Sequence, residues 1–234
     1  MKDKVAELNR KFRNTPPEEI LLWFITDFGD KVAFSTSLGA EDQVITQMFA
    51  RIKKPIKIFT LDTGRLFQET YDLLDLTQKK YGLTIEVYFP ETVNVEKMVR
   101  SKGINLFYES IENRQQCCHI RKIEPLKRAL AGKEVWITGM RKEQSVTRSY
   151  ADLISWDPAN EVIKVNPLIR WSVEQVWEYI NTWNIPVNDL HAKGYPSIGC
   201  SPCTRAVKPE EDLRSGRWWW ELPEFKECGL HKTH

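Results

Sequence analysis

Short apolar runs alternate with amphipathic segments over most of the chain. The runs are rich in β-branched and aromatic residues, which predicts strands at residues 31–37, 56–62, 83–89, 133–140 and 161–167. The segments between them carry apolar residues at helical spacing, which predicts helices at residues 41–52, 65–82 and 118–132. This order predicts an α/β fold, a parallel sheet flanked by helices, with ligands at the carboxyl ends of the strands.

Length and composition limit how such a sheet is organised. A chain of 234 residues is long enough for one α/β domain, and we expect residues 1–234 to form a single domain. Within it we expect an N-terminal helical segment, residues 1–29, and a mobile C-terminal tail, residues 205–234. No window approaches the roughly 18 apolar residues of a membrane span, and the charged N-terminus lacks the features of a secretion signal. We therefore expect a cytoplasmic protein without a membrane partner.

Two strand ends carry small and polar residues. The first turn, FSTSLGAEDQ, offers hydroxyl and backbone N–H groups at the start of a helix, where a phosphate or sulfate group can bind. The same pattern also fits an ordinary strand-to-helix turn. The second turn, TLDTGRLFQET, places Asp62 and Thr63 where a ribose or an adenine edge can be hydrogen-bonded. Two such turns favour a nucleotide over a simple anion.

Basic side chains form a second part of the predicted site. The third strand end contains Arg141, Lys142 and Arg148, and Arg214 and Arg217 precede three consecutive tryptophans. Guanidinium groups bind the oxygen atoms of phosphate and sulfate in bidentate geometry. A solvated basic loop is the alternative for the first group. The tryptophans cannot all face one way, so we expect them to anchor the tail and hold two arginines near the site.

The five cysteines form two pairs and one isolated residue. Cys117 and Cys118 are adjacent, and Cys200 and Cys203 enclose Ser-Pro, which in a reducing compartment indicates metal binding or catalysis. Adjacent thiolates reach two corners of one metal centre only when the centre is wide, which favours an iron–sulfur cluster over zinc. The basic neighbours that can offset the thiolate charge are Arg114, His119, Arg121 and Lys122. The alternative is a buried pair of small hydrophobic residues and a separate redox pair.

Cys228 stands apart from both pairs, close to Lys226 and His231. Cationic neighbours lower the pKa of a thiol, and a tail cysteine that can enter and leave a site suits a covalent mechanism. The alternative is an inert surface thiol near the end of the chain.

The motifs RQQCCHIRKIEPL, SIGCSPCTRAV, SGRWWWE and KECGLH, with FSTSLGAED, TLDTGRLFQET and GMRKEQSVTR, resemble those of the assimilatory adenylyl-sulfate reductases, relatives of the phosphoadenylyl-sulfate reductases. The resemblance covers nearly the whole chain. It implies a Rossmann-like adenine nucleotide α-hydrolase-type fold with a C-terminal tail over the site. It also implies an oxidoreductase that reduces adenosine 5′-phosphosulfate to sulfite and AMP, in sulfate assimilation and cysteine biosynthesis.

The resemblance implies roles for single residues. The metal ligands would be Cys117, Cys118, Cys200 and Cys203, which together hold one 4Fe–4S cluster per chain. The substrate-binding residues would be Ser35, Ser37, Gly39, Glu41, Leu61, Asp62, Thr63, Arg141, Arg148, Arg214 and Arg217. Lys122 would link the cluster to the substrate electrostatically, Cys228 would be the nucleophile, and His231 belongs to the matching catalytic motif.

The implied reaction needs a second protein. The Cys228 thiolate attacks the sulfur of the substrate, AMP leaves, and a Cys228 thiosulfonate remains. Reduced thioredoxin or glutaredoxin then releases sulfite, because the other four cysteines are committed to the cluster. A net charge of +2 gives no general basic field, so we expect no nucleic-acid partner. A homo-oligomer is compatible with the sequence.

Other functions stay open at this point. Phosphoadenylyl sulfate is an alternative substrate, alone or together with adenylyl sulfate. A ligase or sulfurtransferase on the same fold would need a Gly-Gly-x-Asp-Ser type loop, which residues 35–42 do not provide. An iron–sulfur regulator that binds nucleic acid is the non-enzymatic alternative, and it would leave Cys228 without a role.

Overall fold

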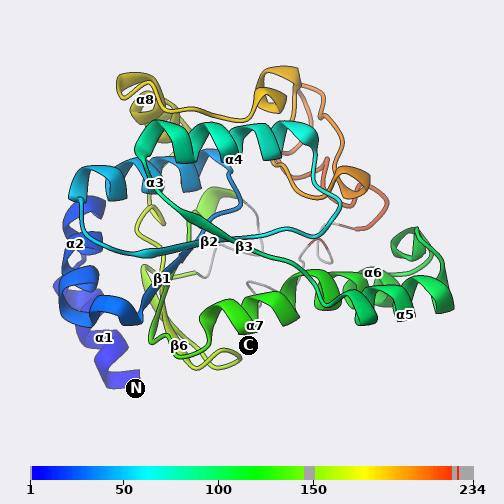
Figure 1. The fold of residues 1–234 in the computed structure, drawn as a ribbon. Helices are drawn as coiled ribbons and strands as arrows, with labels where there is room; N and C mark the ends of the chain where they lie inside the picture. The colour runs from blue at the N-terminus through cyan, green and yellow to red at the C-terminus, as the bar shows by residue number, and fades with distance from the viewer. Residues whose placement is uncertain (1, 145–150, 223–225, 227–234) are drawn as a thin grey trace.

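A six-stranded sheet forms the centre of the fold within the residues that this computed structural model describes, 2–144, 151–222 and 226 (Figure 1). Its order is β3-β2-β1-β4-β6-β5. The strands are β1 (Val32–Ser35), β2 (Lys57–Leu61), β3 (Ile85–Tyr88), β4 (Val135–Ile137), β5 (Ile154–Asp157) and β6 (Val162–Val165). All pair in parallel except β5, which is antiparallel to β6. The five predicted strands are confirmed, and β5 is an addition that the sequence analysis did not predict.

Helices cover both faces of this sheet. They are α1 (Lys2–Lys11), α2 (Pro17–Phe28), α3 (Ala40–Ile52), α4 (Gln68–Tyr81), α5 (Thr92–Lys102), α6 (Ile111–Cys118), α7 (Glu124–Leu130) and α8 (Val173–Thr182). Figure 1 shows α3, α4 and α8 on one side of the sheet and α6 and α7 on the other. The helices predicted at 41–52 and 65–82 are confirmed as α3 and α4. No helix in the described part of the chain is long and apolar enough to cross a membrane.

Side chains alternate between the two faces of the sheet. Phe34 of β1 and Ile137 of β4 pack into the larger core with α2, α3 and α8, whereas Ala33 and Trp136 face α7. Both faces are buried, as expected for parallel strands that are connected by helices. The functional side chains therefore gather at the carboxyl edge of the sheet, where the loops begin.

One long helical stretch carries the adjacent cysteines. It starts as α6, whose first turn is capped by the side chain of Ser110, passes through a π-helical turn at His119–Ile123 and continues as α7. The helix predicted at 118–132 therefore begins earlier, at Ile111, in a segment too polar to show a helical period. Pro125 accounts for the wide turn, because it has no N–H to donate to the preceding turn and its ring excludes ordinary α-helical geometry there.

The chain from residue 189 to residue 222 packs against the carboxyl edge of the sheet. As expected from the loss of pattern near residue 191, its described helical structure is limited to 3₁₀ turns at Asp189–Lys193 and Ser201–Cys203. A buried ion pair holds the C-terminal end of this segment against α6. Arg114 of α6 donates to both carboxylate oxygens of Glu221, at 2.9 and 2.7 Å, and the two side chains are 0% and 2% exposed.

Arg114→Ala should destabilise the fold strongly, because it leaves the Glu221 carboxylate buried without this partner. Breaking a buried ion pair costs about 3–5 kcal/mol, so we expect a loss of that size in the free energy of unfolding, measured in urea. The control Asp75→Asn removes an exposed pair with Lys79 and should change stability little. Equal stability of Arg114→Ala and the wild type would contradict the role of the buried pair.

Candidate active site

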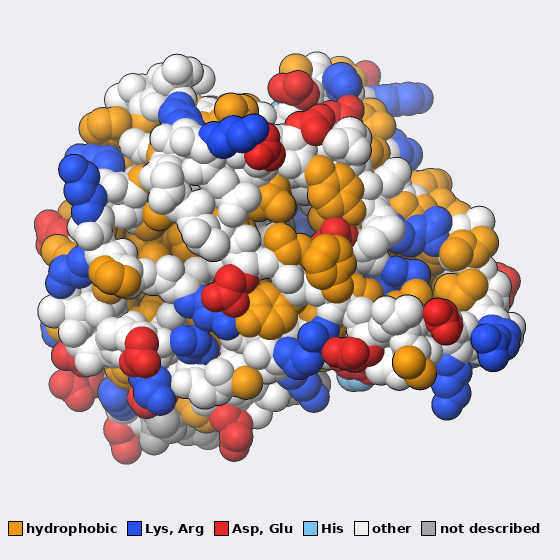
Figure 2. Space-filling model, in the orientation of Figure 1, with side chains coloured by type: hydrophobic (Ala, Val, Ile, Leu, Met, Phe, Trp, Pro, Cys, Tyr) orange, Lys and Arg blue, Asp and Glu red, His pale blue; other side chains and the backbone are white. Residues whose placement is uncertain are grey.

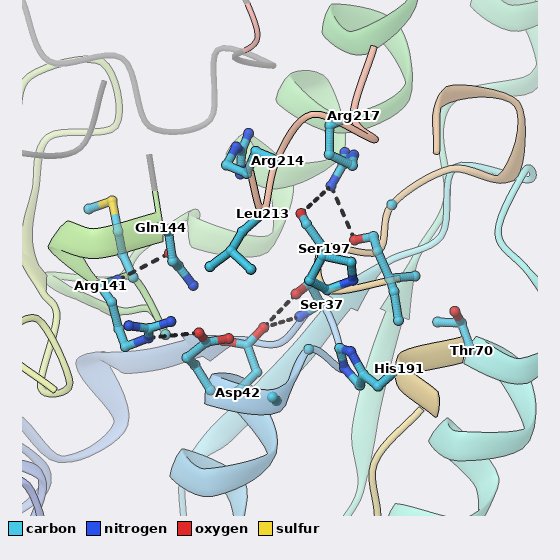
Figure 3. Close-up of a pocket in the computed structure, with 18 of the residues that line it drawn as sticks. Ser37, Asp42, Thr70, Arg141, Gln144, His191, Ser197, Leu213, Arg214 and Arg217 are labelled. Carbon is cyan, nitrogen blue, oxygen red and sulfur yellow. Dashed lines mark hydrogen bonds and ion pairs between the residues drawn. The ribbon is translucent and has the colours of Figure 1, made fainter. Parts of the chain in front are cut away.

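A cavity of about 640 Å³ opens at the carboxyl ends of β1, β2 and β4. Figure 3 shows side chains from the strand ends and from the C-terminal segment converging on it. The predicted site residues that line it are Ser35, Ser37, Gly39, Glu41, Leu61, Thr63, Lys122, Arg141, Arg214 and Arg217. Its volume is typical of a ligand-binding pocket. The fold thus brings together residues from distant parts of the chain.

One buried carboxylate organises the turn between β1 and α3. Asp42 accepts hydrogen bonds from the backbone N–H and from the hydroxyl of Ser37, at 2.6 and 2.7 Å. Leu38 has a positive φ of 61°, and its N–H donates to the hydroxyl of Thr36 at 3.0 Å. A bulky residue in the left-handed region is strained and is retained only where its surroundings hold it. Ser37 therefore shapes the turn with its hydroxyl in addition to lining the cavity.

The same carboxylate joins this turn to the end of β4. Gly139 packs so closely against Asp42 that a Cβ atom there would overlap the carboxylate oxygen Oδ1. Burial raises the pKa of Asp42 to about 6, and the hydrogen bonds from Ser37 limit the rise. The cavity thus contains a carboxyl group that titrates near neutral pH, a role that the sequence analysis did not assign to it.

Asp62, in the turn after β2, forms its side-chain hydrogen bonds with protein groups close to it in the sequence. Asp62 is buried and accepts hydrogen bonds from the Gly64 N–H at 2.7 Å and from the Tyr71 hydroxyl at 3.0 Å. It does not line the cavity, whereas Leu61 and Thr63 on either side of it do. The structure therefore supports a role for Asp62 in shaping the turn and gives no direct access of its carboxylate to a ligand in the cavity.

Arg141 lies on the cavity wall and is bonded to protein groups. Its Nε donates to Glu41 at 2.8 Å, and its Nη1 donates to the Trp171 carbonyl at 3.1 Å. The side chain is almost completely buried. Arg141 and Glu41, both predicted to bind substrate, thus form a link between the end of β4 and the start of α3.

Two buried arginines enter the cavity from the C-terminal segment. Arg217 donates to the Ile198 carbonyl at 3.2 Å and lies against Gly199, where any Cβ atom would overlap its guanidinium group. Arg214 donates to the Lys226 carbonyl at 3.0 Å. Figure 3 shows both arginines on one side of the cavity, with Asp42 and Arg141 on the other. Buried guanidinium groups favour an anionic ligand, because their charge is no longer offset by water.

The cavity also contains residues that the sequence analysis did not single out. Trp136 donates from Nε1 to the hydroxyl of Ser35 at 2.8 Å, which orients that hydroxyl. His191 lies with Nδ1 2.9 Å from the Tyr195 carbonyl, and burial lowers the pKa of His191. Trp136 belongs to a predicted core strand, and His191 belongs to a segment without regular pattern. Neither position carries a sequence signal for a site.

The four paired cysteines converge beside the cavity. Cys117, Cys118 and Cys203 are buried in one hydrophobic cluster with Trp218, and Cys200 packs against it; we call this group the cysteine cluster. None of the four forms a disulfide within the described residues. Burial raises the pKa of Cys203 to about 12 and also raises that of Cys117. Thiols with raised pKa values are neutral near pH 7 unless a metal centre displaces their protons.

Two residues that adjoin these thiols carry buried hydrogen-bond donors. Nε1 of Trp218 and Nε of Arg121 have no acceptor among the described residues. Thiolate and sulfide sulfur atoms would accept from such donors, so the residues fit a 4Fe–4S cluster. In the described ranges no group of three or more His, Cys, Asp or Glu side chains is arranged to hold a metal ion.

Lys122 and Arg217 connect the cavity with the cysteine cluster. Both line the cavity, and the positive charges of both lower the pKa of Cys203 against the effect of burial. His119, in contrast, is half-exposed and lies 3.7 Å from Glu124, so it does not compensate the thiols. Two cations of the cavity wall thus also act electrostatically on a buried thiol.

Three predicted site residues lie outside the described residues. They are Arg148, which follows β4, and Cys228 and His231 near the end of the chain.

Asp42 should make stability depend on pH. Its pKa is raised from 3.8 to about 6, so between these values the folded protein keeps a proton that the unfolded chain has released. Stability from this group is therefore present at low pH and is lost as the pH rises through about 6, by up to about 3 kcal/mol. Asp42→Asn removes the titration. In urea denaturation across this pH range, the wild type should lose stability relative to Asp42→Asn as the pH rises, and a constant difference would refute the assignment.

Comparisons with known proteins identify relatives. Residues 31–206 match the family model of the phosphoadenosine phosphosulfate reductase domain. A protein of Allochromatium vinosum named adenosine 5′-phosphosulfate reductase is 53% identical over 203 residues, 87% of this chain and 79% of the relative. The crystal structure of phosphoadenylyl-sulfate (PAPS) reductase from Candida auris, a phosphate complex, is 29% identical with a TM-score of 0.76, covering 88% of this chain and 98% of its own.

A more distant structure shares the fold alone. Yeast FAD synthetase is 16% identical with a TM-score of 0.56, over 87% of this chain and 66% of its own. The predicted α/β fold, a mostly parallel sheet flanked by helices, is confirmed, as is the expectation of a reductase enzyme. The chain belongs to the phosphoadenosine phosphosulfate reductase family.

Proposed function

We propose that this chain reduces adenosine 5′-phosphosulfate to sulfite and AMP, with reduced thioredoxin or glutaredoxin as electron donor. The observation that carries the proposal is the cavity at the strand ends, which Lys122, Arg214 and Arg217 line and which the cysteine cluster adjoins through Trp218. An acidic nucleotide in the cavity would share these cations with the thiolates. The name of the relative that is 53% identical, adenosine 5′-phosphosulfate reductase, supports this substrate. The reaction would serve sulfate assimilation and cysteine biosynthesis in the cytoplasm.

The cavity has two chemically different sides for such a substrate. Ser35, Gly39 and Leu61 line it at the strand ends, where a nucleoside can contact small side chains and backbone groups. Arg214 and Arg217 line the opposite side, where the phosphosulfate would be held. The guanidinium groups reduce the repulsion between an anionic substrate and an incoming thiolate, which is the main electrostatic barrier of the reaction.

The cysteine cluster suits a 4Fe–4S group held by Cys117, Cys118, Cys200 and Cys203. When bound, the group would supply structural support and an electrostatic centre beside the substrate, and the two electrons of the reaction would come from the dithiol. Lys122 would hold the phosphosulfate toward the cluster, because its charge acts on Cys203 from a position on the cavity wall.

The covalent steps would take place at Cys228. Its thiolate attacks the sulfur of the substrate, the S–O bond to the phosphate breaks, and AMP leaves with the electron pair. A thiolate of the reduced partner then attacks the Cys228 sulfur, and sulfite leaves. The second thiol of the partner resolves the mixed disulfide and restores the Cys228 thiolate, so the partner is oxidised by two electrons and the sulfonate group is reduced by two. His231 would help to hold Cys228 at the site.

Phosphoadenylyl sulfate is the alternative substrate, alone or together with adenylyl sulfate. It differs only in a 3′-phosphate, and the related structure from Candida auris is a phosphoadenylyl-sulfate reductase. Identity of 29% with that protein, against 53% with the adenylyl-sulfate reductase, favours adenylyl sulfate.

Cys228→Ser should abolish sulfite formation while AMP still binds. Loss of a covalent nucleophile lowers the rate by at least about 1,000-fold. We would measure sulfite release by anaerobically purified protein with reduced thioredoxin, offering adenylyl sulfate and phosphoadenylyl sulfate in parallel. Thr233→Ala, a change in the same tail, is the control and should keep the wild-type rate.

The outcomes of this assay separate the candidate functions. A ratio of rates in favour of adenylyl sulfate supports the proposed substrate, and the reverse ratio supports the alternative. Turnover by Cys228→Ser would refute the nucleophile. If iron-loaded wild-type protein releases no sulfite from either compound, the reductase proposal is wrong and a nucleic-acid-binding regulator becomes the better hypothesis.

Cys203→Ala should prevent cluster assembly, because a 4Fe–4S centre normally needs four thiolates. The wild type purified without oxygen should contain about four iron and four acid-labile sulfide per chain, and Cys203→Ala should contain little of either. Ser201→Ala, in the same turn, is the matched control and should retain both. Zinc without sulfide in the wild type would contradict the proposed cofactor.

A further inference from the structure

Large apolar side chains are exposed beside the cysteine cluster. Ile104, Tyr108, Trp219 and Leu222 have exposed fractions of 57%, 44%, 39% and 62%, and we call these four the apolar patch. Figure 2 shows hydrophobic side chains gathered at the end of the molecule where α5 and α6 lie in Figure 1. Two of them, Tyr108 and Trp219, are in contact, and large exposed apolar patches mark sites of protein–protein interaction.

The patch is held in place by the structure beneath it. The ring of Tyr108 lies 6.1 Å from that of Trp219 and 4.5 Å from that of Trp220, and its hydroxyl donates to the Pro202 carbonyl at 2.7 Å. Trp218, in contrast, is almost fully buried in the cysteine cluster. The consecutive tryptophans thus divide their roles, because the first anchors the segment and the second presents its ring to water. Anchoring alone does not explain the exposed ring.

Lys226, which precedes Cys228 by two residues in the sequence, contacts the segment that carries the patch residue Trp219. The Lys226 carbonyl accepts from Arg214 at 3.0 Å, and the Lys226 ammonium donates to the Ser215 carbonyl at 3.2 Å. Lys226 is therefore held against the segment that carries Trp219.

We propose that the apolar patch is the docking surface for the protein dithiol that releases sulfite from Cys228. The inference rests on the proposed function, since only a sulfonated Cys228 needs this partner. Thiol exchange requires the thiolate of the partner to contact the Cys228 sulfur, so the partner must cover the surface next to Lys226. The matching partner is a small disulfide oxidoreductase with apolar side chains around its Cys-x-x-Cys motif.

The character of the patch fits a short-lived complex with such a protein. Tyr and Trp are the side chains that most often dominate binding energy in interfaces, and Tyr108 and Trp219 form the aromatic centre of the patch. Arg65, on its edge, donates to the Ile104 carbonyl and lies 5.0 Å from the ring of Phe107. Transient redox contacts are small, whereas a permanent dimer needs a larger apolar area.

The test compares a protein dithiol with a small one. Dithiothreitol can reduce the Cys228 thiosulfonate without a docking surface, whereas thioredoxin needs one. We would measure sulfite release from adenylyl sulfate by the holoenzyme variants Ile104→Glu, Leu222→Glu and the double variant, with each reductant. Neither residue lines the cavity. Leu76→Glu is the matched control, because Leu76 is 51% exposed on α4, on the other side of the sheet.

We expect each single variant to lower kcat/KM for thioredoxin about fivefold to tenfold, and the double variant to lower it further. The rates with dithiothreitol and the KM for adenylyl sulfate should match the wild type, as should all values for Leu76→Glu. Equal losses with both reductants, or no loss with thioredoxin, would overturn the docking surface. A shift in oligomeric state in the double variant, with thioredoxin kinetics unchanged, would assign the patch to a second copy of the chain. If the wild type releases no sulfite even with dithiothreitol, the proposed function is wrong, and the docking surface inferred from it is wrong as well.

Discussion

The buried ion pair between Arg114 and Glu221 is the contact on which the arrangement of the site depends. It joins the helix that carries Cys117 and Cys118 to the segment that carries Arg214 and Arg217. The ring of Trp218 lies between two guanidinium groups, 4.8 Å from that of Arg114 and 4.8 Å from that of Arg217. The ion pair thus holds the ring of Trp218 in place, and this ring in turn holds the guanidinium group of Arg217 in the cavity. These contacts explain why a segment with little regular secondary structure keeps its charges in fixed positions.

The second feature of the site is that buried groups of opposite charge are packed side by side. Buried thiols have raised pKa values, and buried guanidinium groups need anions, so each alone would be costly to fold. Packing them side by side lets Lys122 and Arg217 face both the cysteine cluster and the cavity. A bound acidic nucleotide and deprotonated thiolates would complete this balance. The surface above the same cluster is apolar, so the cluster lies between a charged cavity and an apolar surface.

Much of the fold could be predicted from the sequence because the signals were local. The strand runs and the helices α3 and α4 follow from hydrophobic period, and the paired cysteines follow from spacing. The misplaced start of the helix around the adjacent cysteines had a different cause: the first turns of α6 are polar and are stabilised by the Ser110 cap and by Arg114, whose partner lies more than a hundred residues away. Propensity gave no sign of a contact at that distance.

The roles of side chains in the site could likewise be predicted only in part from the sequence. The sequence by itself determined which turns are polar, where the basic residues lie in the chain and which cysteines are paired, because residue type and spacing are enough for these. Only the tertiary structure decided that Asp62 serves its own turn, that Arg141 is bonded to Glu41, and that Asp42 holds Ser37. The reason is physical: a polar group binds the partner that burial leaves closest to it, and that partner is set by packing between segments rather than by neighbours in the chain.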